Sequence, residues 1–170
     1  MANCIIALGQ IRFRIGDNKA ADSLFNTAAS ILKQVGEPLG EANCIMGRAK
    51  IRFRRGDDLR ADSLYNAALV IFQQVGEPLG EANCIMTLGN IPLRKGLQLG
   101  AHQKFIQALE LFQSIDHNYS IGRAYMQLAQ ISQRRSERDQ YIKLCLEHLE
   151  KGGAAHLIPR VLKLLPDYEQ

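Results

Sequence analysis

The twelve-residue stretch VGEPLGEANCIM occurs at Val35–Met46 and again, letter for letter, at Val75–Met86. The two copies lie 40 residues apart, and the same offset relates other parts of the chain. Further matching segments are IRFR at 11–14 and 51–54, and ADSL at 21–24 and 61–64. Self-similarity at one fixed period of this length indicates an array of structural repeats.

Each repeat is predicted to form two helices. Gly36 suits the left-handed position that ends a helix, and Pro38 suits the first turn of the next one. Gly56 ends that helix in turn, and Asp57 or Asp58 can cap the following helix by accepting backbone N–H bonds. The apolar stripe of this second helix, which runs to about residue 75, consists of Leu64, Ala68, Leu69 and Phe72. Because no window shows sustained strand alternation, the fold class is predicted to be all-α.

Four repeats are predicted to fill most of the chain. Their boundaries are expected at about residues 1–38, 39–78, 79–118 and 119–150, with a C-terminal capping helix and tail at 151–170. The apolar stripe of the tail comprises Ile158, Val161, Leu162, Leu164 and Leu165. We expect this helix to begin near Pro159 and to cover the fourth repeat. The alternative is a docking helix for another molecule.

Composition excludes several classes of protein. With 46% hydrophobic residues, a chain of 170 residues can bury a core. No apolar run approaches the roughly 18 residues that cross a bilayer, and the start MANCIIALGQIRFR lacks the basic residues of a secretory signal. We therefore expect a cytoplasmic protein that binds no membrane.

Three of the four cysteines, Cys4, Cys44 and Cys84, occupy equivalent positions. Equivalent sites on stacked helix pairs lie roughly 8–10 Å apart, beyond the roughly 7 Å limit between the Cα atoms of a disulfide. These cysteines are therefore predicted to be small buried apolar residues in a reducing compartment.

The second helix of each of the first three repeats carries a small–aromatic–small pattern. The three copies are Ala21-x3-Phe25-x2-Ala28, Ala61-x3-Tyr65-x2-Ala68 and Ala101-x3-Phe105-x2-Ala108. The first helices add Ile5-x2-Leu8-Gly9 and Ile85-x2-Leu88-Gly89. Together these motifs resemble the tetratricopeptide repeat family over about 150 of the 170 residues.

The resemblance implies a right-handed α-solenoid of about four antiparallel helix hairpins plus a C-terminal capping helix. Its 40-residue period is longer than the usual 34 of the family. In this respect the chain is similar to the long-helix subgroup found in kinesin light chains, LGN-type adaptors and the sensor arrays of signalling ATPases. The resemblance also implies that the first helices line the concave side of the array.

The sequence departs from the family pattern at three places. Pro92 lacks an N–H, so we expect a kink or an early end in its helix. The fourth repeat replaces the small–aromatic–small trio with Tyr141, Cys145 and His148, so its second helix should pack differently. Met1 stands where later repeats have Glu41, so either the chain was cut from a longer array or its first helix is partly uncovered.

Polar, apolar and basic positions recur on one stripe of each first helix, at spacings of three, four and four residues. The four sets are Asn3, Ile6, Gln10 and Arg14; Asn43, Met46, Lys50 and Arg54; Asn83, Met86, Asn90 and Arg94; and Arg123, Met126, Gln130 and Arg134. Amides can bond a peptide backbone, methionine offers a deformable apolar floor, and arginine pairs with carboxylates. These ladders are predicted to line a groove for an extended or helical peptide with acidic side chains.

Each ladder also has a structural explanation. The arginines lie in last turns, where a cation favours the helix dipole. The asparagines can bond the backbone of a neighbouring hairpin, and the methionines can fill the core. Recurrence does not decide between these readings, because duplication copies structural and functional residues alike.

No motif for catalysis is present. The chain has no phosphate loop, GxSxG, HExxH or paired CxxC, so we expect neither an enzyme nor a cofactor. Cys145 and His148 share one helical face, but no second pair completes a zinc site, so no metal is predicted. Despite the net charge of +4, acidic residues interrupt the basic stretches Arg52–Arg60 and Arg134–Arg138, and no specific nucleic-acid binding is predicted.

The sequence thus favours a non-enzymatic scaffold that binds a protein or peptide partner. The alternative is a structural module that self-associates through an exposed terminal hairpin or the C-terminal helix. Neither the partner nor the oligomeric state follows from the sequence.

Overall fold

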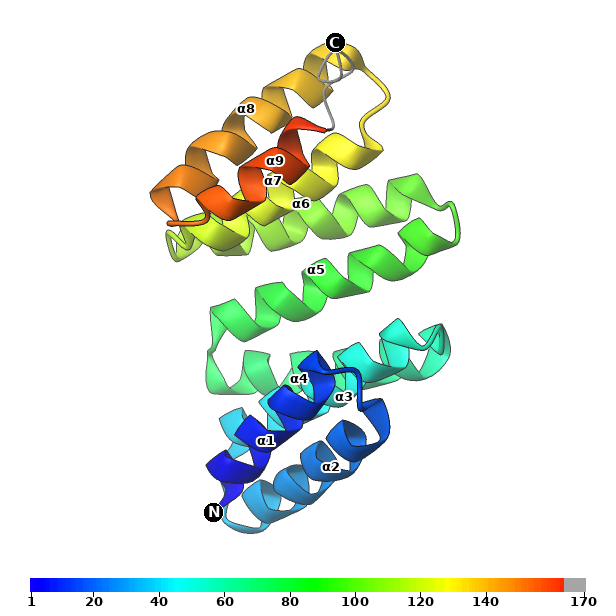
Figure 1. Cartoon of the computed structure of the whole chain (residues 1–170), viewed down its shortest axis with the longest axis vertical. Helices are drawn as coiled ribbons and strands as arrows, with labels where there is room; N and C mark the ends of the chain where they lie inside the picture. Colours follow the sequence, from blue (N-terminus) through cyan, green and yellow to red (C-terminus); the bar gives the residue numbers. More distant parts are fainter. Residues whose placement is uncertain (164–170) are drawn as a thin grey trace. The chain divides into compact units, whose positions relative to one another are not determined.

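The computed structural model describes residues 1–163, and this part of the chain is helical with no strand (Figure 1). The helices are α1 (Ala2–Arg14), α2 (Asn18–Gln34), α3 (Pro38–Arg54), α4 (Asp58–Val75), α5 (Pro78–Arg94), α6 (Gln98–Ser114), α7 (Asn118–Ile131), α8 (Arg135–Lys151), the 3-10 helix η1 (Ala155–Leu157) and α9 (Ile158–Leu162). The predicted all-α class is confirmed.

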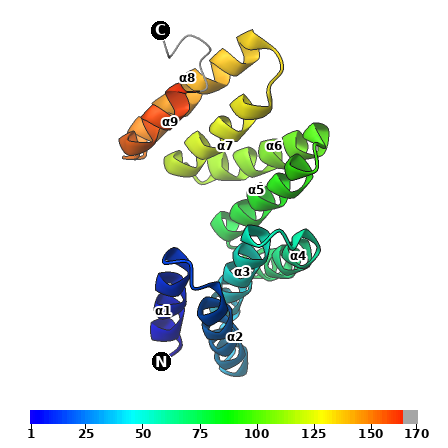
Figure 2. The same ribbon diagram turned by 45° about the vertical axis from the view of Figure 1, so that its right-hand side comes forward.

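The chain divides into two compact units. The N-terminal unit, Met1–Ile91, holds α1 to α4 and most of α5, and the C-terminal unit, Pro92–Gln170, holds the end of α5 and the later helices. In the N-terminal unit α1 pairs with α2 and α3 pairs with α4, and in the C-terminal unit α7 pairs with α8 (Figure 2). Within each unit, helices that follow one another in the sequence therefore pack as antiparallel pairs.

Left-handed residues end the helices at intervals of 20. They are Gly16, Gly36, Gly56, Gly76 and Gly96, with φ between 67° and 87°, and then Asp116, with φ of 51°. At Gly76 the amide N–H bonds the Gln73 carbonyl at 3.3 Å, which closes the last turn of α4. The predicted glycine stops are confirmed. Asp116 takes the same conformation with a side chain, which strains the backbone.

Replacing Asp116 with glycine is expected to stabilise the chain by about 0.5–1 kcal/mol, because glycine removes the Cβ clash of the left-handed conformation. Urea unfolding followed by circular dichroism measures the change. The control Glu110→Gly lies inside α6 and should destabilise by about 1 kcal/mol. A lower stability for Asp116→Gly would contradict this account of the corner.

Side chains and proline start the helices where the sequence predicts. The carboxylate of Asp57 accepts the backbone N–H of Arg60 at 3.3 Å, and Asp17 accepts that of Ala20 at 3.1 Å. Helix α3 begins at Pro38, whose missing N–H costs nothing in a first turn.

The core of the N-terminal unit lies along its second helices, α2 and α4. On α4, the buried stripe of Ala61, Tyr65, Ala68 and Phe72 packs between two first helices. Its partners are Ala42 and Ala49 on α3 and Cys84, Leu88 and Ile91 on α5. On α2, the matching stripe of Ala21, Phe25, Ala28 and Leu32 packs against Cys44 and Ile51 of α3. Each second helix thus covers its own first helix and the first helix of the next repeat.

The early end expected at Pro92 is wrong. Helix α5 continues to Arg94, the position equivalent to the end of α3 at Arg54. Pro92 lies in the last turn, where the loss of one N–H breaks one bond only. Its carbonyl then accepts the N–H groups of Lys95 at 3.0 Å and Leu97 at 2.9 Å, which close the helix end.

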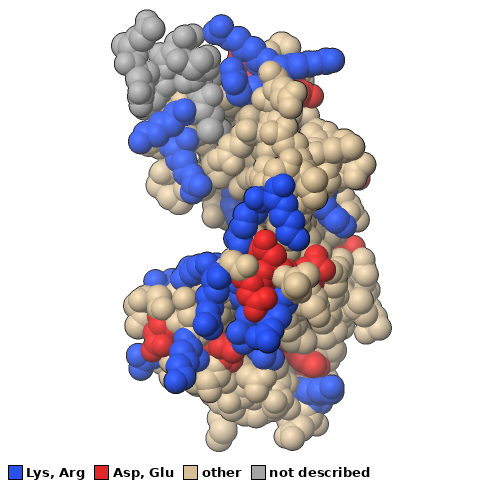
Figure 3. Space-filling model, turned by 90° about the vertical axis from the view of Figure 1, so that its right-hand side faces the viewer, with Lys and Arg blue, Asp and Glu red and all other residues tan. Residues whose placement is uncertain are grey.

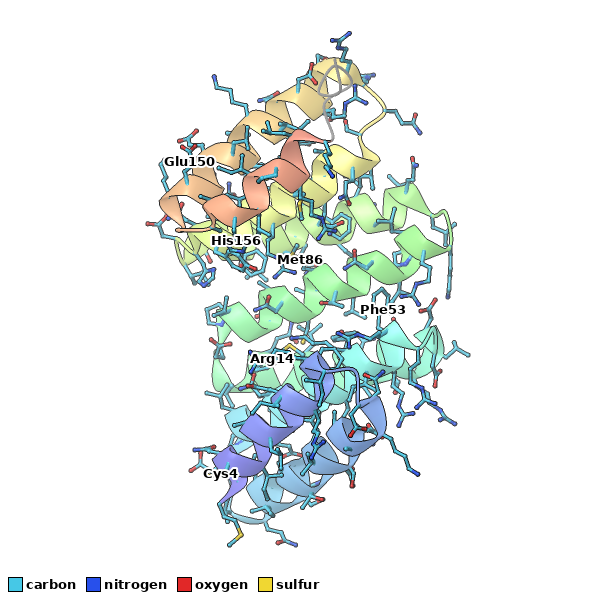
Figure 4. All side chains as sticks on the ribbon, viewed as in Figure 1. Cys4, Arg14, Phe53, Met86, Glu150 and His156 are labelled. Atoms are coloured by element: carbon cyan, nitrogen blue, oxygen red, sulfur yellow. The ribbon has the colours of Figure 1, made fainter. Side chains whose placement is uncertain are left out.

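The burial predicted for the repeated cysteines holds for Cys44 and Cys84 and is wrong for Cys4. All four cysteines are free thiols, and Cys4 is exposed. The residues that cover Cys44 lie on the preceding second helix, and in the structure no helix precedes α1. Figure 4 labels Cys4 at the start of α1.

The fourth repeat packs differently, as its sequence predicts. The ring of Tyr125 on α7 lies 6.1 Å from that of Tyr141 and 5.8 Å from that of His148, both on α8. The Nδ1 atom of His148 also lies 2.7 Å from Oδ1 of Asn118. A stack of rings therefore replaces the small–aromatic–small contact of the earlier repeats.

The terminal helix packs on α8. Helix α9 begins at Ile158, next to Pro159, and buries Val161 completely. Ile158 and Leu162 are half-buried. The other two members of the predicted stripe, Leu164 and Leu165, lie outside the described residues.

Candidate functional site: a groove in the N-terminal unit

Helices α1, α2 and α3 line an open cavity of about 1010 Å³. This volume is at the upper end of the roughly 300–1,000 Å³ of pockets that hold organic ligands. Phe25 and Leu32 of α2 line it, and both side chains are buried. The remaining lining comes mainly from α1 and α3. We call this cavity the N-terminal groove.

Glycines let the helices of the groove approach the α2 side chains. A Cβ added at Gly9 of α1 would lie 3.1 Å from Cε1 of Phe25, and one at Gly47 of α3 would lie 3.0 Å from the same ring. A Cβ at Gly40 would lie 3.0 Å from Leu32. The Phe25 ring is therefore packed between two helix backbones, and the floor of the groove is tightly packed and apolar.

The groove brings together parts of two predicted ladders. From α1 they are Asn3, Ile6, Gln10 and Arg14, and from α3 they are Asn43, Met46 and Lys50. Asn3, Gln10 and Asn43 are exposed amides, whereas Ile6 and Met46 are half-buried. Figure 4 labels Arg14 at the end of α1. Amide groups, an apolar floor and cations thus share one cavity.

Arg54, the remaining predicted residue of α3, does not line the groove. One guanidinium nitrogen donates to the Phe13 carbonyl at 3.0 Å, and the guanidinium carbon lies 3.8 Å above the Phe13 ring. This cation–π contact ties the end of α3 to the end of α1.

The predicted residues on α5 lie outside the groove. Met86 is buried. The amide of Asn83 donates to the Leu79 carbonyl at 2.8 Å, and that of Asn90 donates to the Met86 carbonyl at 3.3 Å. Both amides therefore bond their own helix rather than a neighbouring hairpin. Arg94 is exposed at the helix end.

The predicted residues on α7 and after it belong to the C-terminal unit. Met126 is buried, and the guanidinium carbon of Arg123 lies 5.7 Å from the Tyr119 ring. Gln130 is exposed. Arg134 lines a separate cavity of about 430 Å³ together with Gln98 and His102.

Sequence reasoning missed Phe25 and Leu32, which form the floor of the groove. Both belong to the apolar stripe of α2, and a stripe of this kind predicts core packing. The signal that was available is glycine at positions 40 and 47, because small residues on a first helix let its backbone lie directly against the side chains of the second helix.

The charge of the groove is mixed with a cationic excess. Arg14 and Lys50 line it, against a single carboxylate from Glu37. On the face drawn in Figure 3, basic and acidic side chains lie interleaved rather than in one basic band. Among residues 1–163, no cluster of His, Cys, Asp and Glu is arranged to hold a metal ion. No helix in this range is long and apolar enough to cross a bilayer.

Burial raises the pKa of three thiols. The pKa of Cys44 rises from 9.0 to about 11 through burial and the nearby charge of Glu41. Burial alone raises that of Cys145 to about 11. Burial also raises the pKa of Cys84 to about 12, although the charge of Lys50 opposes the rise.

These shifts predict that the fold weakens above pH 9. The folded chain holds the thiol protons more tightly than the unfolded chain, so the stability they contribute is complete below pH 9.0 and is lost as the pH rises towards 11 or 12. Each thiol contributes a slope of up to about 1.4 kcal/mol per pH unit. Urea unfolding between about pH 8 and about pH 10.5 measures this slope. Cys84→Ala should reduce it and Cys4→Ala should not; equal slopes in both variants would contradict the assignment.

Comparison with known proteins gives matches in structure only. No protein-family profile and no curated protein sequence matches the chain. The crystal structure of the apo form of RapI matches with a TM-score of 0.85 at 15% identity, over 99% of this chain and 64% of RapI. This chain therefore spans less than two thirds of the length of RapI.

Two further structures contain tetratricopeptide-type repeats. A signal transduction ATPase with a tetratricopeptide repeat sensor, from Pyrococcus horikoshii, matches with a TM-score of 0.77 at 13% identity, over 96% of this chain and 26% of that protein. A putative kinesin light chain from Podospora anserina matches with a TM-score of 0.57 at 11% identity, over 98% and 93% of the two chains. Structural similarity at such low sequence identity establishes the fold and nothing more. The chain therefore has a tetratricopeptide-like repeat fold with a terminal helix.

Proposed function

We propose that the chain is a protein-interaction module whose N-terminal groove binds an extended peptide segment with acidic side chains. The repeat fold is typical of protein–protein interaction. The observation that carries the proposal is the cavity of about 1010 Å³, which amides, cations and apolar side chains line together.

Each type of lining residue has a task in peptide binding. Asn3, Gln10 and Asn43 carry donors and acceptors that match the N–H and C=O groups of an extended backbone. Ile6 and Met46, which are half-buried in the lining, offer an apolar surface for one anchor side chain of the ligand. Arg14 and Lys50 supply positive charge for carboxylates on the ligand, and Arg14 can hold a carboxylate with two parallel bonds.

Fluorescence anisotropy with a library of acidic peptides tests the proposal. For the peptides that bind, the double variant Arg14→Glu, Lys50→Glu should lose affinity by at least about tenfold, or about 1.4 kcal/mol. The control Lys19→Glu, Lys143→Glu changes the net charge equally at exposed positions outside the groove. Its affinity should stay within about twofold of wild type. Equal affinities of the two double variants would exclude the groove cations from binding.

A further inference from the structure

Helix α1 carries an apolar stripe that faces solvent. It consists of Cys4, Leu8 and Ile11 and continues at Ile15, the residue that follows α1, at spacings of four, three and four residues. Leu8 is 43% exposed, Ile11 is 47% exposed and Ile15 is 66% exposed, and Cys4 is also exposed. We call this stripe the α1 outer face. It differs from the N-terminal groove, because none of these four residues lines the groove.

The positions equivalent to Cys4 and Ile11 are buried in the next two repeats, and the position equivalent to Leu8 is buried in the third. Cys44 and Ile51, 40 residues after Cys4 and Ile11, have no exposed surface. In the third repeat Cys84 has none, and Leu88 and Ile91 are each 5% exposed. Helix α2 covers the face of α3, and α4 covers the face of α5. The chain thus shows twice which kind of helix packs on this face.

We propose that the α1 outer face binds a helix of the α2 and α4 type, supplied by another hairpin of this repeat. The sequence of such a helix is Ala-Asp-Ser-Leu followed by Phe or Tyr, Asn, one variable residue and Ala, as at 21–28 and 61–68. Its small residues allow close approach, and its aromatic ring fills the space against α1. This surface is additional to the groove and does not depend on the peptide that the groove binds.

Charge complementarity supports this occupant. Where α2 packs on α3, the carboxylate of Asp22 accepts from Arg52 at 2.7 Å and from Arg48 at 3.2 Å. Arg12 of α1 stands at the position equivalent to Arg52. Its nearest carboxylate oxygen, on Asp17 of its own unit, lies 3.7 Å away in an exposed pair. An aspartate at the position of Asp22 on the bound helix would place a carboxylate beside Arg12.

The same argument disfavours pairing of two α1 outer faces between copies of the chain. Helix α1 contains no Asp or Glu, whereas Arg12 and Arg14 both lie in its last turn. A second α1 would bring arginine and no carboxylate to the contact. Like charges without a partner oppose association.

Cys4 provides a built-in probe of occupancy, because it is the exposed thiol while Cys44, Cys84 and Cys145 are buried. In the full chain we expect one thiol to react rapidly with 5,5′-dithiobis(2-nitrobenzoate). The ligand is a synthetic peptide of residues 17–37 with Asn26→Lys and Ser30→Asp, whose two new side chains are joined in a lactam because an isolated helix of this length is marginal in water. Both positions are exposed on α2. At a concentration about ten times its Kd, the peptide should slow the labelling of Cys4 about tenfold.

Charge and surface variants locate the binding site. A peptide with Asp22→Lys should protect Cys4 at least about fivefold less, and the chain variant Arg12→Glu should restore its protection by reversing the pair. Ile11→Arg on the outer face should abolish protection, because the equivalent Ile51 is fully buried under α2, whereas Arg14→Glu in the groove should leave it unchanged. These variants also distinguish this surface from the groove, because failure of acidic peptides to bind leaves the Cys4 result unaffected.

Three results would overturn the proposal. One is labelling of Cys4 that the wild-type peptide does not slow, and another is equal protection by the wild-type and Asp22→Lys peptides. The third is a dimer, detected by light scattering of the chain alone, that Ile11→Arg dissociates, because a second copy would then be the occupant.

Discussion

Replacing Phe72 with alanine is expected to lower the free energy of unfolding by about 3–5 kcal/mol, the range for removing a buried aromatic side chain. Phe72 has no exposed surface and packs between α3 and α5. A Cβ on Gly80 would collide with its ring, so helix α5 lies directly against it. The substitution would leave a cavity in the core at the joint between two repeats.

Urea unfolding followed by circular dichroism measures this loss. The matched control is Val70→Ala on the same helix, where the valine is 51% exposed. Because its side chain is half in solvent, it should cost less than about 1 kcal/mol. Equal losses for the two variants would mean that Phe72 does not hold the repeats together.

The second large effect is expected from Asp22. This aspartate of α2 accepts bonds from two arginines of α3, and all three side chains are at most 26% exposed. Asp22→Ala would leave both guanidinium groups partly buried without a carboxylate. Because a bond to a charged group contributes about 1.5–3 kcal/mol, we expect a loss in that range.

The next repeat supplies the control. Asp62 is the equivalent of Asp22, but Leu88 and Pro92 stand where Asp22 meets Arg48 and Arg52. Asp62 instead accepts the exposed amide of Asn66 on its own helix at 3.1 Å. Asp62→Ala should therefore cost at most about 0.5 kcal/mol, measured by the same unfolding experiment. A cost as large as that of Asp22→Ala would show that the ion pairs do not account for the effect.

The contrast between Asp22 and Asp62 shows how much of a residue's role one sequence motif can predict. Both lie in an identical Ala-Asp-Ser-Leu segment, and both occupy the same place on a second helix. Only the residues of the next first helix make one of them a bridge between repeats. The motif predicts a helix. The residues of the neighbouring repeat determine how much its aspartate contributes to the free energy of unfolding.

The candidate site, too, was predicted from the sequence only in part. The spacing of Asn43, Met46 and Lys50 correctly predicted that they share one stripe of a helix, because 3.6 residues per turn is a local property. The spacing does not show which other helices pack against that stripe. Arg54 continues it but turns onto Phe13 of α1, and Met86 has the same register as Met46 but is buried.

By itself, the sequence determined the period, the helices and their ends, because left-handed glycines, N-terminal prolines and apolar spacing act within a few residues along the chain. Only the tertiary structure decided that α1 and α3 line an open groove next to Phe25 and Leu32, and that Cys4 is exposed where Cys44 and Cys84 are buried. Burial depends on whether a helix lies against a given face. Equivalent helices of the repeats present similar residues on each face, but the helices that pack against these faces differ.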